Sequence, residues 1–159
     1  MSWSTSLCAA AATVALLGAC DSGVPENAEE DAAQVTYSCC SAEDVDTLYR
    51  PGQTMSVHWM VEAPNGPATD APPVELTARL SGPYATVEEL KAAEGDLRNP
   101  AGDVTFTAPP IRPTGTPGEQ PVSSIPISAD ARPGYYYLIT SENQGGGSVS
   151  GGSIIRVVA

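Results

Sequence analysis

Cys39 and Cys40 are neighbours in the chain, and this pair is its most unusual chemical feature. Adjacent cysteines can form a vicinal disulfide, although their Cα atoms lie only about 3.8 Å apart across a trans peptide bond, below the usual disulfide range. In a regular strand the two side chains would point to opposite faces and could not pair. A vicinal disulfide is therefore one expectation. Buried thiols, intermolecular bonds and metal binding are the alternatives.

His58 is the only histidine, and Met60 follows it at a spacing of two residues. Positions i and i+2 of a strand share a face, so the imidazole and the thioether could bind the same ion. Soft sulfur ligands with one imidazole suit cuprous copper, and Cys39 and Cys40 could add to the set. A histidine and a methionine also occur close together without any ligand. Copper is therefore an alternative, and no cofactor is the first expectation.

Known catalytic motifs are missing from the sequence, which has no His-Glu-x-x-His, Gly-x-Ser-x-Gly, phosphate-binding glycine loop or Cys-x-x-Cys. A Ser-His-Asp triad would need His58, and no local sequence supports one. Glu43, Asp44 and Asp46 could bind calcium weakly, but the pattern is closer to a solvated acidic loop. The sequence predicts a protein that is not an enzyme. An enzyme without a recognisable motif remains the alternative.

The elements that would position these residues are mostly strands. Polar and apolar residues alternate over Met55–Val61 and Val74–Leu80, while Tyr135–Thr140 is apolar on both faces and is expected to be central. Shorter strands are predicted near 35–39, 104–106, 125–127 and 153–158, with Pro126 placing its strand at an edge. The glycine-rich stretch 145–152 is predicted to be a mobile hairpin loop.

One short helix is expected from Val87 to Glu94. Thr86 and Glu89 have the spacing of a capping box, and Gly95 would end the helix. The helix is interpreted as a lid on the edge of the β-structure.

Seven short strands separated by turns are typical of a β-sandwich. Gln53–Val61 resembles an early core strand of immunoglobulin-like domains, and Asp130–Tyr137 is similar to the turn and tyrosine that open strand F. Ser153–Val158 resembles strand G. The resemblance covers residues 34–159 and implies an all-β, immunoglobulin-like β-sandwich of about seven strands with one short helix. Neither predicted core strand contains the cysteine of the inter-sheet disulfide found in antibody domains.

Tyr136 lies in the tyrosine run of the predicted central strand. Facing outward, it would offer a stacking surface for sugars, whereas facing inward it would pack in the core.

Residues 1–19 contain no acid and no base, and their apolar run is too short to cross a membrane. The run ends in Leu17-Gly18-Ala19-Cys20, which resembles the lipobox of bacterial lipoproteins. The resemblance implies a signal peptide over 1–19, cleavage before Cys20, and a lipid on Cys20 that anchors the exported chain to the outer side of a cell membrane. One departure is the lack of Lys or Arg at the start.

The chain has 19 acidic and 7 basic residues and a formal net charge of −12, which disfavours binding to nucleic acid or to anionic lipid headgroups. Residues 20–33 are acidic without any aromatic residue and are predicted to be a flexible tether before the domain at 34–159. The first hypothesis is a non-catalytic envelope lipoprotein whose domain binds or scaffolds an envelope protein or polysaccharide. A soft-metal carrier using His58 and Met60 is the second hypothesis.

Overall fold

The structure is a computed structural model that describes residues 35–62, 72–93, 102–116 and 118–159. These residues belong to one unit spanning 31–159. The predicted signal peptide, the acidic tether, Cys20 and Gly95 lie outside the described residues. Within the described ranges, no helix is both long enough and apolar enough to cross a membrane.

Strands make up most of the described chain, and two short helices lie between them. The strands are β1 (Thr36–Ser38), β2 (Leu48–Tyr49), β3 (Thr54–His58), β4 (Met60–Glu62), β5 (Val74–Tyr84), β6 (Val104–Thr107), β7 (Val122–Pro126), β8 (Gly134–Gln144) and β9 (Gly147–Val157). The helices are α1 (Ala42–Asp46) and α2 (Val87–Ala93). The predicted all-β class with a short helix is confirmed, and α1 is an additional helix that was not expected.

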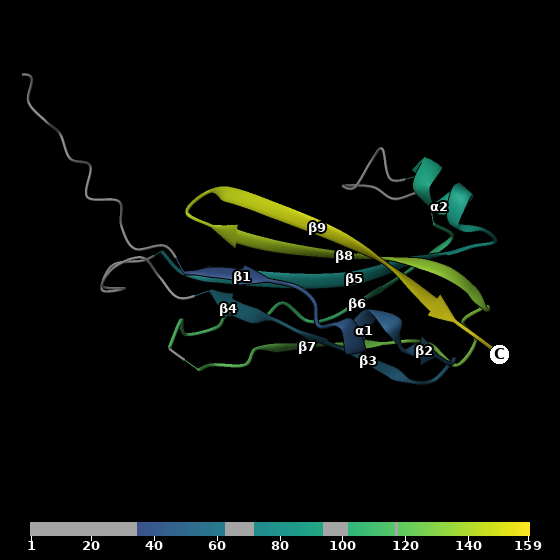
Figure 1. Ribbon diagram of the computed structural model, residues 1–159, viewed down its shortest axis with the longest axis horizontal. Coiled ribbons are helices and arrows are strands. Elements are labelled where there is room, and N and C mark those ends of the chain that lie inside the picture. Colours follow the sequence, from purple (N-terminus) through teal and green to yellow (C-terminus); the bar gives the residue numbers. More distant parts are fainter. Residues whose placement is uncertain (1–34, 63–71, 94–101, 117) are drawn as a thin grey trace, which may run out of the picture. The chain divides into compact units, whose positions relative to one another are not determined.

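The strands form two layers that face each other (Figure 1). The first is a five-stranded sheet in the order β2-β9-β8-β5-β6, antiparallel except for the parallel pair β2–β9. The second consists of the antiparallel pairs β1–β4 and β3–β7. The predicted central position of Tyr135–Thr140 is confirmed, because β8 lies between β9 and β5. Among the described strands β7 pairs only with β3, which agrees with the edge position expected from Pro126.

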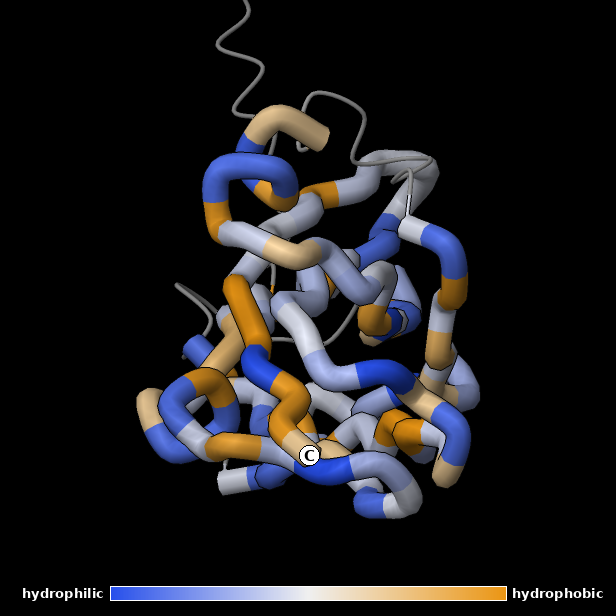
Figure 2. Tube along the Cα trace, turned by 90° about the vertical axis from the view of Figure 1, so that its right-hand side faces the viewer, coloured by the Kyte–Doolittle hydropathy of each residue, from blue (hydrophilic) through white to orange (hydrophobic). Residues whose placement is uncertain are grey.

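The core lies between the two layers and is built from alternate residues of the strands. Met55 and Val57 of β3 are fully buried in one cluster with Tyr136 and Leu138 of β8. The same cluster contains Val35, Tyr37, Tyr49, Trp59, Val74, Leu76, Ala78, Leu80, Ala108, Ile125, Ile127, Ile155 and Val157. Figure 2 shows hydrophobic and hydrophilic segments following each other along the chain. This alternation directs apolar side chains to the shared interior.

The single strand predicted over Met55–Val61 is divided at Trp59, so this prediction was wrong in part. β3 pairs with β7, whereas β4 pairs with β1. Between them the main-chain N–H of Trp59 donates to the carbonyl of Pro121 at 3.0 Å, and the indole Nε1 donates to Oγ of Ser123 at 3.0 Å. The alternation of side chains continues through the change of partner strand, so periodicity could not reveal the division.

The predicted loop over 145–152 was also wrong, because only Gly145 and Gly146 form the turn and β9 begins at Gly147. Both turn residues have positive φ, 56° and 87°, a conformation that glycine adopts without steric cost. A Cβ at Gly152 would overlap the ring and hydroxyl of Tyr137. The glycine therefore permits close approach of a tyrosine within a paired strand.

Helix α2 begins as predicted. Oγ1 of Thr86 accepts from the N–H of Glu89 at 3.1 Å, and the Glu89 carboxylate accepts from the N–H of Ala85 at 3.0 Å. The side chain of Leu90 is buried against Tyr137 and Ile139 of β8. These two residues lie on the face of β8 opposite the core, so α2 covers the outer face of the five-stranded sheet. The expectation that it covers an edge was wrong.

Candidate functional site

The site begins with helix α1, in the segment that the sequence indicated to be a solvated acidic loop. Ser41 is its N-cap: the hydroxyl Oγ accepts from the N–H of Asp44 at 3.3 Å, and the Asp44 carboxylate accepts from the N–H of Ser41 at 3.2 Å. This reciprocal pair is a capping box, and the Ser-x-x-Asp spacing was the signal that could have predicted it. Asp44 is only 4% exposed, so the loop interpretation was wrong for this residue.

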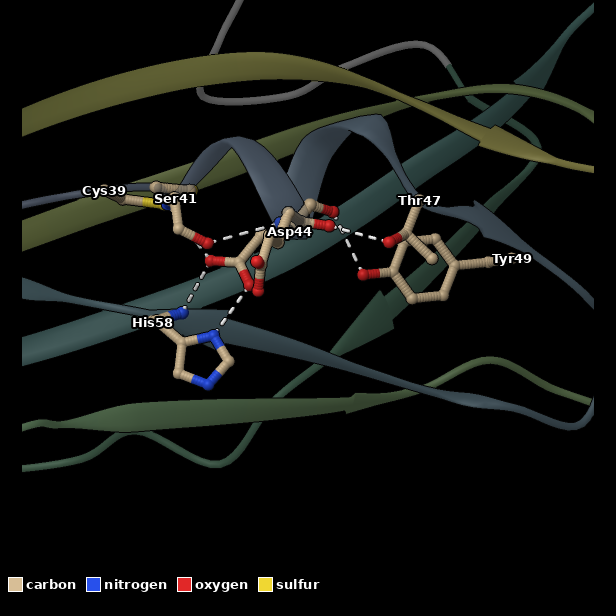
Figure 3. A network of polar contacts seen from close by, with 8 residues as sticks. Cys39, Ser41, Asp44, Thr47, Tyr49 and His58 are labelled. Carbon is tan, nitrogen blue, oxygen red and sulfur yellow. Dashed lines mark hydrogen bonds and ion pairs between the residues drawn. A yellow bond between two sulfur atoms is a disulfide. The ribbon is translucent and has the colours of Figure 1, made fainter.

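Asp44 holds His58 in place through two hydrogen bonds (Figure 3). Its Oδ1 lies 2.7 Å from Nδ1 of the His58 ring, and its Oδ2 accepts from the main-chain N–H of His58 at 2.9 Å. The Asp44 side chain is buried, whereas the His58 side chain is 54% exposed. One carboxylate thus joins α1 to the end of β3 and leaves the outer part of the imidazole accessible.

The surroundings of Asp44 favour its ionised form. Burial acts to raise the pKa of this carboxyl, but the hydrogen bonds from the main chain and ring of His58 and from Ser41 outweigh it and hold the pKa below its usual value. The hydroxyl of Tyr49 donates to the main-chain carbonyl of Asp44 at 3.0 Å. Burial raises the pKa of Tyr49, and the negative charge of Asp44 raises it further.

The accessible side of His58 borders a hollow of about 380 Å³. Met60 lines the same hollow and is half exposed, so the two predicted ligands share one surface although they belong to different strands. Met55 is fully buried in the core and is not part of this surface. With Nδ1 bonded to Asp44, the ring offers its Nε2 to a ligand, an arrangement found for metal-bound histidines.

Cys39 and Cys40 are joined to each other by a disulfide, and their peptide bond is cis. Their Cα atoms are 3.1 Å apart, closer than the separation of about 3.8 Å expected across a trans peptide bond. Both residues pack against the core directly before the cap residue Ser41. In this state they present no thiolate to a metal. The described residues contain no group of three or more His, Cys, Asp or Glu side chains placed to hold an ion.

Glu142 is a second buried acid, and sequence reasoning did not identify it. Its Oε2 accepts from the main-chain N–H of Tyr37 at 3.0 Å, which fastens β1 to β8. The residue occupies a position of β8 that alternation assigns to the interior, and a polar residue at an interior position was the available signal.

Tyr136 points into the core and is not exposed, so it offers no stacking surface to a sugar. Its hydroxyl donates to the main-chain carbonyl of Arg132 at 2.8 Å, four residues earlier. Tyr135 of the same run is partly exposed, and the Arg156 guanidinium lies over its ring, 5.6 Å from the ring centre.

The chain was compared with protein-family models, curated proteins and solved structures. No protein-family model matches the chain, and no curated protein matches it. Among solved structures, the chain is similar to the sporulation control protein Spo0M from Bacillus subtilis, with 18% identity and a TM-score of 0.39. The match covers 80% of this chain and 50% of the Spo0M chain, so the chain spans about half the length of that protein.

Proposed function

We propose that this chain is an exported lipoprotein, anchored through Cys20, whose folded domain is a non-catalytic binding or scaffolding module of the cell envelope. The observation that carries the proposal is the sequence Leu17-Gly18-Ala19-Cys20 at the end of an uncharged apolar run. A lipid on Cys20 fixes the chain to a membrane, and the acidic segment that follows separates the domain from the surface.

The disulfide between Cys39 and Cys40 supports export. Disulfides persist in oxidising compartments and are rare in the cytosol, where thiols are kept reduced. The bridge lies at the start of the domain, directly before the Ser41 cap. A role in holding the entrance of the domain is consistent with its packing against the core.

Strand pairing supports an immunoglobulin-like sandwich. In that fold strands B and E are neighbours in one sheet, and C, F and G are neighbours in the other. The pairs β3–β7 and β5–β8–β9 have these relationships, and β6 lies beside β5 as strand C′ lies beside C. The hydrogen bond from Tyr136 to the carbonyl of Arg132 corresponds to the tyrosine corner at the start of strand F. The departure is the missing inter-sheet disulfide.

A binding role fits the polar contacts better than catalysis does. The Asp44 carboxylate accepts hydrogen bonds from the cap of its own helix, Ser41, and from the main chain and ring of His58, which fasten α1 to β3. The net charge of −12 favours a partner that is neutral or basic. A neutral or basic envelope protein and an uncharged polysaccharide meet this condition, whereas nucleic acid, which is strongly negative, does not.

The anchor is tested by the intact mass of the chain isolated from membranes. We expect a mature chain that begins at Cys20 and carries lipid, with two hydrogens fewer per molecule than the reduced form because of the internal disulfide. Cys20→Ser should abolish both lipid and membrane association. Cys8→Ser is the matched control, because Cys8 lies within the signal peptide and its loss should change neither. A chain that carries no lipid at Cys20 would contradict the proposal.

A second function, soft-metal binding, is favoured by one observation. The bond between Nδ1 of His58 and Asp44 leaves Nε2 for a ligand, and His58 and Met60 both line the hollow of about 380 Å³. Titration of the full chain with cuprous copper, in competition with a coloured chelator, tests this function. Binding should disappear in His58→Ala, weaken about tenfold or more in Met60→Leu, and persist in Met55→Leu. Equal copper binding by His58→Ala and the original chain would rule it out.

A further inference from the structure

No strand that the structure describes pairs with the outer edge of β9 over most of its length. Within the described ranges, β9 pairs along its whole length with β8 on one side, but on the other side it pairs only with β2, at Arg156 and Val157. The stretch Gly147–Ser153 therefore has main-chain groups without a neighbouring described strand. An edge of this kind is a ready template for another extended chain.

This edge lacks the features that proteins use to prevent such pairing. Gly147–Ser153 reads Gly-Ser-Val-Ser-Gly-Gly-Ser, with no charge and no proline, and six of its seven residues are exposed. Lysine, proline and bulges are the usual means of protecting an edge strand. Val149 is its only large side chain and is 73% exposed. Gly147 and Gly151 have no side chain, which leaves room for a second main chain to approach closely.

A hollow next to the open edge would receive side chains of an added strand. It measures about 250 Å³, and its lining includes Val149, Ser150 and Gly151 of β9. Thr36–Cys39, Trp59 and, from β8, Thr140 and Glu142 complete the lining. Alternate side chains of a strand point to one face, so an extended segment on β9 would direct every second side chain toward this hollow.

We propose that the edge Gly147–Ser153 binds an extended segment of another polypeptide, which is basic and carries apolar side chains at alternate positions. Main-chain hydrogen bonds to β9 would supply affinity, and the hollow beside Val149 would select the apolar side chains. This inference rests on the proposed binding function and specifies the surface and the class of partner.

Charge decides between such a partner and a second copy of this chain. Each copy carries a net charge of −12, so pairing two β9 edges would bring two acidic chains together. A basic segment is attracted by the same field. The edge itself contributes no opposing charge, because Gly147–Ser153 is uncharged.

The test uses the full lipid-anchored chain in detergent and a fluorescent synthetic peptide of alternating valine and threonine with a lysine at each end. Hydrogen exchange followed by mass spectrometry should show slower exchange over Gly147–Ser153 when the peptide is bound. A peptide of the same sequence, N-methylated at alternate amides, should bind about tenfold more weakly or worse, because it cannot donate its main-chain hydrogen bonds. A version with glutamate in place of lysine should also bind more weakly.

A pair of matched variants locates the surface. Val149→Lys places a positive charge on the open edge and should reduce peptide affinity about tenfold. Val122→Lys makes the same change on β7, at another partly exposed valine, and should retain the original affinity. Both valines are exposed enough for the variants to fold.

Three results would overturn the inference. The first is no change in exchange over Gly147–Ser153 with the lysine peptide. The second is equal affinity for the N-methylated peptide. The third is slower hydrogen exchange of this stretch at higher protein concentration, without any peptide, that is lost in Val149→Lys. This result would show that the edge binds a second copy of the chain. The proposed anchor fails separately, through the absence of lipid on Cys20, whatever the edge binds.

Discussion

The main-chain N–H and the ring Nδ1 of His58 both bond to the carboxylate of Asp44, at 2.9 and 2.7 Å. Asp44→Asn should therefore destabilise the domain by about 2 kcal/mol, because it weakens charged hydrogen bonds to His58 and to the cap residue Ser41. Urea unfolding measures the change. Asp46→Asn is the control on the same helix, where the side chain is exposed, and it should leave stability nearly unchanged. Equal stability of the two variants would show that the Asp44 contacts contribute little.

The contribution of Asp44 should also depend on pH. Its folded-state pKa lies below its unfolded value of about 3.9, so ionisation is favoured by folding. The stabilisation is complete above the unfolded pKa and is lost as pH falls through the folded-state pKa. The difference in unfolding free energy between the original chain and Asp44→Asn should shrink as pH falls below about 4. A difference that stays constant to lower pH would contradict the assignment.

Gly152→Ala should destabilise the domain by about 1–3 kcal/mol, because the new Cβ would overlap the Tyr137 side chain and force it to move. Gly151→Ala is the neighbouring control. Its Cβ would meet only Oγ1 of Thr140 at 3.5 Å, an ordinary contact. Thermal unfolding of both variants measures the difference. The same loss in both would mean that chain stiffness, and not the tyrosine, determines the effect.

Trp59 and Ser123 should be energetically coupled. The indole Nε1 donates to Oγ of Ser123 at 3.0 Å, and both residues are buried. Trp59→Phe and Ser123→Ala each remove one partner, and each leaves the other polar group unsatisfied. The double variant should therefore be more stable than the sum of the two losses predicts, by about 1 kcal/mol. Additive losses in a double-mutant cycle would show that the bond adds no stability of its own.

Much of the fold could be predicted because alternation of side chains depends only on which face is buried. The strands around Met55, Leu76 and Leu138 follow that rule, and Thr86 with Glu89 marks the start of α2. Which strands pair could not be predicted in this way, because strand pairing depends on contacts between residues distant in sequence. The change of partner at Trp59 therefore left no trace in the pattern.

The candidate site was harder to predict, because it too depends on contacts between residues distant in sequence. His58 was identified by its residue type, whereas Asp44 lies fourteen residues earlier and meets it only when α1 packs on β3. Helix α1 has five residues, too few to show a helical period. Gly152 was assigned to a loop because glycine usually disfavours strands, and the Tyr137 ring that requires it lies on the partner strand.

The segment Thr36–Tyr49 is held to the rest of the domain by four successive contacts. β1 pairs with β4, and the Tyr37 N–H bonds to Glu142 of β8. Asp44 then joins α1 to β3, and β2 pairs with β9. If the chain is held at Cys20 while a partner pulls on the domain, mechanical tension reaches these fastenings one after another. β1 and its bond to Glu142 would yield first, then α1, and the β2–β9 pair last. The domain would thus yield to a pull by releasing its first segment stepwise, and the steps would expose in turn the core residues Tyr37 and Tyr49 of that segment.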